Sequence, residues 1–105
     1  MQIQVNSDTS LAVTTELSEL VEARISSSLE RFTDRITRAE VHLSDVNGER
    51  FGTADKRCLL EVRLSGLDPV AVTAEAATPE LAASGAAQKM QRLLTSTLGR
   101  SEARS

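Results

Sequence analysis

The chain has 105 residues, of which 40% are hydrophobic and 26% charged, a composition typical of one small globular domain and too apolar for a disordered protein. Its 12 basic and 15 acidic residues give a formal net charge of −3. A single cysteine, Cys58, excludes a disulfide within the chain and a zinc site with several cysteine ligands. Residues 1–6 do not resemble a secretory signal, and no apolar stretch is long enough to span a membrane, so we expect a cytoplasmic protein.

In the first third of the chain, the hydrophobic pattern predicts a strand followed by a helix. Residues 2–6 alternate polar and apolar side chains, which is typical of a half-buried strand. A helix is predicted over residues 15–33, with Thr14 or Thr15 as its N-cap. Its apolar side chains recur at helical spacing along one face only. They are Leu17, Leu20, Val21, Ile25, Leu29 and Phe32.

Three more strands are predicted from a return to a period of two. Residues 38–44 and 57–65 each alternate apolar and polar side chains, as a strand buried on one face requires. The Asn-Gly dipeptide at residues 47–48 favours a tight hairpin turn between them, with a longer loop as the alternative. A turn at residues 66–69 leads to the last predicted strand, residues 70–74.

A second helix is predicted to begin at Thr78, Pro79 and Glu80 and to run to about Leu98, with Gly99 as a left-handed stop. The side chains of its inner face are small near the start of the helix and larger further on. This predicts a close approach to the sheet near the start of the helix. That inner face contains Ala83, Ala86, Ala87, Met90, Leu93, Leu94 and Thr97. The predicted outer face contains Gly85, Gln88, Lys89, Arg92 and Ser96.

The element order β-α-β-β-β-α predicts an α+β fold. Four strands with alternating faces and two one-sided helices build a two-layer sandwich, with a four-stranded sheet, both helices on one face and the other face open. We expect a single domain over residues 1–99 and a short flexible tail over residues 100–105.

The sequence favours binding over catalysis. His42 is the only histidine, and it falls on the outward face of a strand between Glu40 and Ser44. We find no nucleophile–base pair, no phosphate-binding glycine-rich loop and no set of side chains at metal-ligand spacing, so we expect no enzyme activity, no cofactor and no metal. Cys58 is interpreted as a small buried strand residue rather than a functional thiol.

The basic residues on the predicted helices are the candidates for a binding surface. Arg24 and Arg31 lie seven residues apart, at the edge of the apolar face of the first helix, and Lys89 and Arg92 are predicted to point outward together from the second. Since both helices cover the same sheet face, these side chains could form one discontinuous patch that contacts phosphates. The alternative is that they are ordinary solvated charges that suit the helix dipoles.

Several segments of the sequence, in order along the chain, resemble one family. These are residues 1–5 (Met-Gln-Ile-Gln-Val), 31–36 (Arg-Phe-Thr-Asp-Arg-Ile), 39–43 (Ala-Glu-Val-His-Leu), 55–58 (Asp-Lys-Arg-Cys) and 92–94 (Arg-Leu-Leu). They resemble the ribosome hibernation promoting factors, a family that includes the ribosome-associated inhibitor called protein Y and proteins labelled sigma factor modulation proteins.

This resemblance implies a protein that binds the small ribosomal subunit and its rRNA, in the channel for messenger and transfer RNA. It implies inhibition of translation and ribosome hibernation in stationary phase or stress, with no small-molecule substrate. The rRNA-binding residues that it implies are Arg24, Arg31, Arg35, Arg38, Lys56, Arg57, Lys89 and Arg92. The chain resembles the short form of the family, without the second domain that pairs ribosomes, and we expect a monomer off the ribosome.

Two alternatives remain open at this point. The net charge of −3 would suit a protein-binding regulator that keeps this fold and has little RNA affinity. Recognition of double-stranded RNA by shape is a third reading, less favoured because no lysine-rich cluster opens the last helix. Sedimentation with ribosomes, capture of a protein partner and binding to bare duplex RNA, respectively, would distinguish the three.

Overall fold

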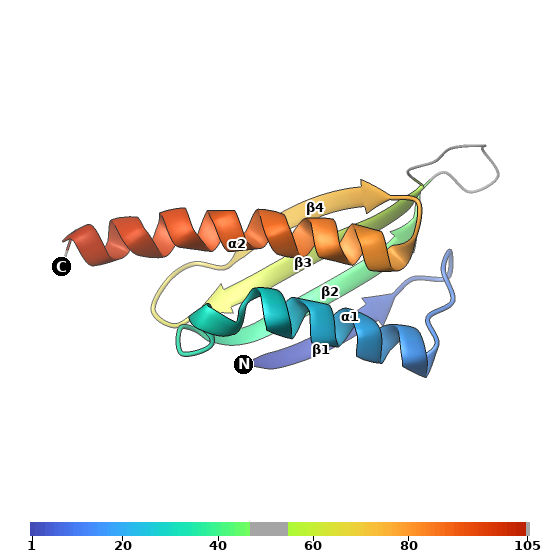
Figure 1. The fold of residues 1–105 in the computed structure, drawn as a ribbon, viewed down its shortest axis with the longest axis horizontal. Coiled ribbons are helices and arrows are strands. Elements are labelled where there is room, and N and C mark those ends of the chain that lie inside the picture. Colours follow the sequence, from blue (N-terminus) through green and yellow to red (C-terminus); the bar gives the residue numbers. More distant parts are fainter. Residues whose placement is uncertain (47–54, 105) are drawn as a thin grey trace.

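The computed structural model describes residues 1–46 and 55–104 and has the predicted α+β fold (Figure 1). The elements are β1 (Gln2–Ser7), α1 (Thr15–Ser28), the 3-10 helix η1 (Glu30–Phe32), β2 (Ile36–Asp45), β3 (Lys56–Leu64), β4 (Val70–Ala76) and α2 (Pro79–Arg104). The predicted hairpin turn at residues 47–48 lies outside the described residues. All four predicted strands are confirmed.

The sheet has the order β1-β2-β3-β4, so β1 and β4 form its two edges. Strand β1 runs parallel to β2, which requires the crossover that α1 provides, whereas β2, β3 and β4 are antiparallel neighbours. Both helices cover one face of the sheet and leave the other open (Figure 1). Polar side chains of the strands therefore face solvent on the side opposite to the helices.

The core lies between the sheet and the helices and is built from aliphatic side chains. On the inward faces of the two central strands, Ala39, Val41, Leu43, Cys58, Leu60 and Val62 are at most 1% exposed. The helix layer covers these strand residues with fully buried side chains of its own. They are Val21 and Ile25 on α1, Leu29 directly after α1, and Met90 and Leu94 on α2, among others. Each such large side chain contributes about 1.5–3 kcal/mol relative to exposure.

The first helix is shorter than predicted. It ends at Ser28, and Glu30–Phe32 form a 3-10 turn instead of a further α-helical turn. Serine is a weaker helix former than alanine or leucine, and residues 26–28 are three serines in succession. The tighter turn still buries Leu29 and Phe32, since side chains three residues apart align in a 3-10 helix. The prediction that Leu20 is buried is also wrong, because this residue is 42% exposed at the edge of the helix facing α2.

The second helix is longer than predicted. Gly99 does not stop it, and α2 continues to Arg104, beyond the end of the sheet in Figure 1. Among the described glycines only Gly66, in the turn before β4, has a positive φ, so Gly99 does not take the left-handed conformation of a helix stop. Gly85 does not lie on the outer face either: a Cβ atom there would be 3.2 Å from the Cβ of Ala74 on β4. This contact confirms the close approach predicted for the start of the helix.

Candidate nucleic-acid interface

A line of polar side chains runs between the two helices on the outer surface of the helix layer. We call it the helix seam. It comprises Arg24, Ser28 and Arg31 on one side and Ser84, Gln88, Gln91 and Thr95 on the other. Sequence reasoning singled out only the two arginines. The signal that would have revealed the rest is spacing: positions 24, 28 and 31, and positions 84, 88, 91 and 95, each repeat every three or four residues, so each set forms one helical stripe.

Local structure orients these two stripes so that they face each other. The hydroxyl of Thr14 accepts a hydrogen bond from the Leu17 amide at 3.1 Å and caps α1, as predicted. The hydroxyl of Thr78 does the same for the Leu81 amide at 3.2 Å and caps α2. With Val21 and Ile25 fully buried against the sheet, Arg24 is placed at the side of α1 that faces α2. Burial thus determines which polar residues reach the seam.

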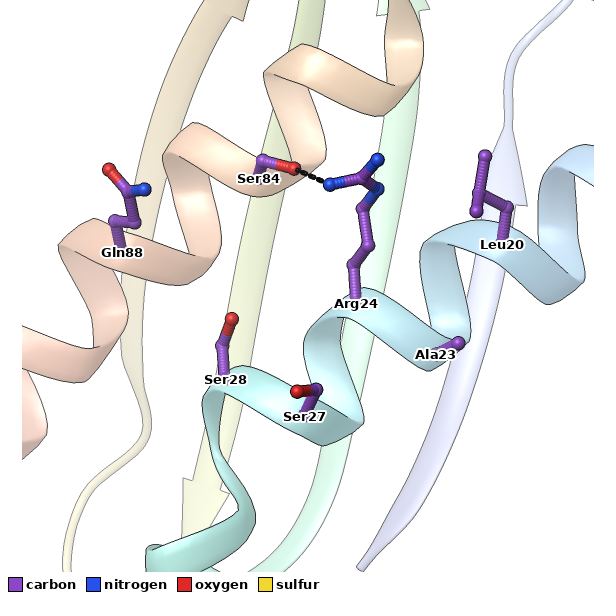
Figure 2. Close-up of a pocket in the computed structure, with 7 residues that line it drawn as sticks. All are labelled: Leu20, Ala23, Arg24, Ser27, Ser28, Ser84 and Gln88. Atoms are coloured by element: carbon purple, nitrogen blue, oxygen red, sulfur yellow. Dashed lines mark hydrogen bonds between the residues drawn. The ribbon is translucent and has the colours of Figure 1, made fainter.

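Arg24 bridges the N-terminal half of the seam. Its Nη1 donates a hydrogen bond to the hydroxyl of Ser84 at 2.9 Å, and Figure 2 shows the side chain crossing from one helix to the other. The surrounding surface hollow has a volume of about 370 Å³ and is also lined by Leu20, Ser28 and Gln88. The guanidinium therefore sits at the wall of an open depression that polar and apolar side chains line together.

Arg31 occupies the other half of the seam. Its Nη2 donates to the hydroxyl of Thr95, and its guanidinium carbon lies 4.7 Å from the ring centroid of the buried Phe32. This stacking is a cation–π contact that restrains the side chain. Arg31 and Arg92 line the same hollow, of about 330 Å³, so the structure brings together two of the predicted phosphate-binding residues.

Four described basic side chains of the helix layer are not neutralised by acidic partners. Within the described part of the chain, no ion pair involves Arg24, Arg31, Lys89 or Arg92. The two seam arginines bond instead to neutral hydroxyls, which fix the side chain and leave its positive charge in place. Guanidinium groups held in this way are suited to donate paired hydrogen bonds to phosphate oxygens.

Lys89 lies away from the seam, at the edge of the helix layer. Its Nζ donates to the main-chain oxygen of Thr73 on β4 at 2.7 Å. Lys89 and Arg92 are both exposed, as predicted, but they serve different surfaces: the lysine reaches the sheet edge, and the arginine lines a hollow with Arg31.

The other predicted basic residues do not join this surface. Arg38 and Arg57 lie on the open face of the sheet, where carboxylates oppose them: Arg38 Nε is 2.9 Å from Glu40 and Arg57 Nη2 is 2.7 Å from Glu75. Arg38 also donates to the side-chain oxygen of Gln4. These two arginines are therefore on the opposite side of the molecule from the seam, with their charge largely compensated.

Lys56 and Arg35 lie at the ends of strands. The Lys56 ammonium is 3.0 Å from Asp55 and 3.2 Å from Asp45, and these carboxylates raise the pKa of the lysine. Arg35 immediately precedes β2, where its main-chain oxygen accepts from the Ser65 amide at 2.8 Å. The eight predicted residues thus divide between the helix layer, the open sheet face and the strand ends.

His42 and Cys58 lie where the sequence predicts. His42 is exposed on the open face of the sheet, with Nε2 3.6 Å from Glu40. A shallow hollow beside it, of about 430 Å³, also includes Ser44 and Leu59. Cys58 is fully buried, and loss of hydration raises the pKa of its thiol to about 12. The thiol therefore stays protonated and unreactive at neutral pH.

Two classes of site can be assessed for the described residues as a whole. Residues 1–46 and 55–104 contain no group of three or more histidine, cysteine, aspartate or glutamate side chains placed to hold a metal ion. Within the same ranges, no helix combines the length and apolar character that crossing a membrane requires.

Comparison with known proteins identifies relatives of this fold. A family model described as Sigma 54 modulation protein / S30EA ribosomal protein matches residues 3–102. The N-terminal domain of Protein Y from Thermus thermophilus is similar in structure, with a TM-score of 0.73 and 22% identity over 92% of this chain and 99% of that one. A ribosomal subunit interface protein from Coxiella burnetii has a TM-score of 0.73 and 18% identity over 94% and 99%. No curated protein sequence is significantly similar.

Proposed function

Because the chain belongs to the family of sigma 54 modulation proteins and S30EA ribosomal proteins, whose members are ribosome-associated factors, we propose that it inhibits translation by binding the small ribosomal subunit. In this proposal it contacts rRNA in the channel for messenger and transfer RNA and promotes hibernation in the cytoplasm of stationary or stressed cells. It acts by occupying the channel and has no chemical step.

The observation that carries the proposal is the uncompensated charge of the helix seam. Arg24 and Arg31 are held by hydroxyls rather than carboxylates, and Arg92 adds a third guanidinium beside the second hollow. Phosphates along an RNA backbone would replace solvent around these groups, and release of counterions from the RNA would drive association. The serine, threonine and glutamine side chains of the seam supply further hydrogen bonds to phosphate and ribose oxygens.

The test compares two double variants with the same change in net charge. Arg31→Gln with Arg92→Gln removes charge from the seam and from the hollow beside it, whereas Arg57→Gln with Arg63→Gln removes charge from the open face of the sheet. Co-sedimentation with purified small subunits should be lost or weakened at least about tenfold in the first variant and change less than about twofold in the second. Equal effects of the two variants would show that the seam is not the RNA-binding surface.

A protein-binding regulator is the second candidate, favoured by the acidic first part of the chain. Residues 1–23 contain Asp8, Glu16, Glu19 and Glu22 and no basic side chain. Affinity capture from stationary-phase cells that recovers a protein partner but no rRNA would support this reading. Recovery of small subunits would support the first.

A further inference from the structure

We propose that the free edge of β1, together with the acidic side of α1 above it, binds an extended protein segment rich in lysine or arginine. The segment would lie beside β1 as an added strand, with its basic side chains reaching the carboxylates of Glu19 and Glu22. This surface is distinct from the helix seam, and its use does not depend on RNA binding.

The first support is the incomplete edge of the sheet. Among residues 1–46 and 55–104, strand β1 pairs with β2 alone, so within these ranges the main-chain donors and acceptors on its outer side have no strand partner (Figure 1). Its inward-facing Ile3 and Val5 are only half-buried, although Ala39 and Val41 opposite them on β2 are completely covered. A further strand would cover this apolar margin and complete the ladder.

The second support is a hollow of about 440 Å³ between β1 and α1. Met1 and Ile3 supply its apolar part, and Glu19 and Glu22 supply its charge. Both glutamates are exposed, and no ion pair of either is present among the described residues. An arginine or lysine fits both features, since its aliphatic stem can pack on apolar surface while its charged end reaches a carboxylate.

The third support is the contrast between the two edges of the sheet. At β4 the Lys89 ammonium bonds to the Thr73 main-chain oxygen, so a strand adding there must displace a charged hydrogen bond. Lysines commonly protect sheet edges in this way. The β1 edge has no basic side chain in residues 1–23 to play that role.

Charge favours a basic protein segment over two other possible occupants of this surface, a second copy of this chain and RNA. A second copy of this chain pairing through β1 would bring Glu19 and Glu22 of both copies together, and the like charges would repel. RNA would be repelled by the same carboxylates. A basic extended peptide is the occupant that satisfies both the edge and the charge.

The probe is a fluorescein-labelled peptide of 12 residues with alternating arginine and threonine, followed by fluorescence anisotropy with the full chain. Glu19→Gln with Glu22→Gln should weaken binding about tenfold, the expected scale for loss of two partly screened ion pairs. The matched control, Asp68→Asn with Glu75→Gln, carries the same net charge at exposed sites just before and on β4, the opposite edge of the sheet, and should bind within about twofold of the parent.

Amide hydrogen exchange by NMR places the peptide. Bound peptide should slow exchange in Gln2–Ser7 and leave Val70–Ala76 unchanged. Equal weakening by both double variants, or protection at β4 or the helix seam instead of β1, would overturn the proposal. The Arg31→Gln, Arg92→Gln variant should still bind the peptide, so failure of the rRNA proposal and failure of this one give different results.

Discussion

Arg31 shows how a single side chain can be positioned without losing its charge. Its hydrogen bond to the Thr95 hydroxyl and its contact with the Phe32 ring restrain the guanidinium, yet neither partner carries a negative charge. By contrast, Arg57 on the open sheet face is held by the Glu75 carboxylate. Both residues are equally visible in the sequence, and only the side chains packed around them distinguish a charge available for phosphate from one already compensated.

Substitution of Arg31 by lysine tests this positioning at constant net charge. Lysine cannot offer the planar fork that stacks on Phe32 and reaches Thr95, so the charge is retained but becomes mobile. We expect Arg31→Lys to weaken binding to small subunits about three- to tenfold, less than Arg31→Gln. The comparison is made by co-sedimentation at fixed salt. Identical affinities for the parent and Arg31→Lys would mean that charge alone matters at this position.

Cys58 provides a prediction for stability at high pH. Its thiol has a pKa of about 12 in the folded chain against an ordinary value of 9.0, so the unfolded chain loses this proton first as the pH rises. Ionisation therefore favours the unfolded state from pH 9 upward, and the free energy of unfolding should fall by about 1.4 kcal/mol between pH 8 and pH 10 through this group. The effect is absent below pH 8.

Urea unfolding of the parent and of Cys58→Ala at pH 8 and pH 10 isolates that contribution. The alanine variant is less stable at both values because it leaves a small cavity, but it should lose less stability between them. A thiol reagent should also modify Cys58 no faster than the chain unfolds. An equal fall in stability for both proteins would contradict the assigned burial of the thiol.

At the scale of elements, periodicity predicted the fold and failed at the ends of helices. Strand faces were correct because alternation directly reports which side is buried, as at Cys58, Leu60 and Val62. The end of α1 was misplaced because Leu29 and Phe32 fit both an α-helical and a 3-10 spacing. The role of Gly99 was misread because a glycine is compatible with either a stop or a continued helix, and only its φ distinguishes them.

The two glycines of α2 should respond differently to alanine. At Gly99 no atom lies within 4 Å of an added Cβ, so Gly99→Ala gains helix propensity of up to about 1 kcal/mol. At Gly85 the same Cβ would stand 3.2 Å from Ala74, so the gain is offset by crowding against β4. Gly85→Leu should destabilise the fold by at least about 1 kcal/mol.

Thermal or urea unfolding measures both substitutions. Gly85→Ala combined with Ala74→Gly relieves the contact and serves as the control for crowding as the cause. If Gly85→Leu is as stable as the parent, α2 does not pack on β4 as closely as described.

Across the whole molecule, basic and acidic side chains lie on different surfaces, although the net charge of the chain is −3. The seam side of α1 presents Arg24, and the side over β1 presents Glu19 and Glu22. Composition alone would argue against RNA binding, because a sum over the chain conceals this division. The separation could not be predicted in full from the sequence, since it depends on which stripe of α1 faces α2 and which faces the sheet edge.

Salt dependence tests the separation for the molecule as a whole. If Arg24, Arg31, Lys89 and Arg92 together neutralise about four phosphates, the affinity for small subunits should fall about 60-fold between 50 and 200 mM monovalent salt. In Arg31→Gln with Arg92→Gln the fall should be only about eightfold, because two of those contacts are gone. Sedimentation across a salt series gives both slopes. Equal slopes would show that these arginines do not contact phosphate.

The position of α2 after all four strands has a consequence for when the domain can fold. Met90, Leu94 and Leu98 supply one wall of the core, and the parallel partner of β1 is synthesised only after α1. During translation β1 therefore cannot pair until β2 has been synthesised, and the core cannot close until residues 90–98 have left the ribosome. A chain still being made lacks the paired helices that form the seam, so any binding through the seam requires that residues 84–95 have already left the ribosome.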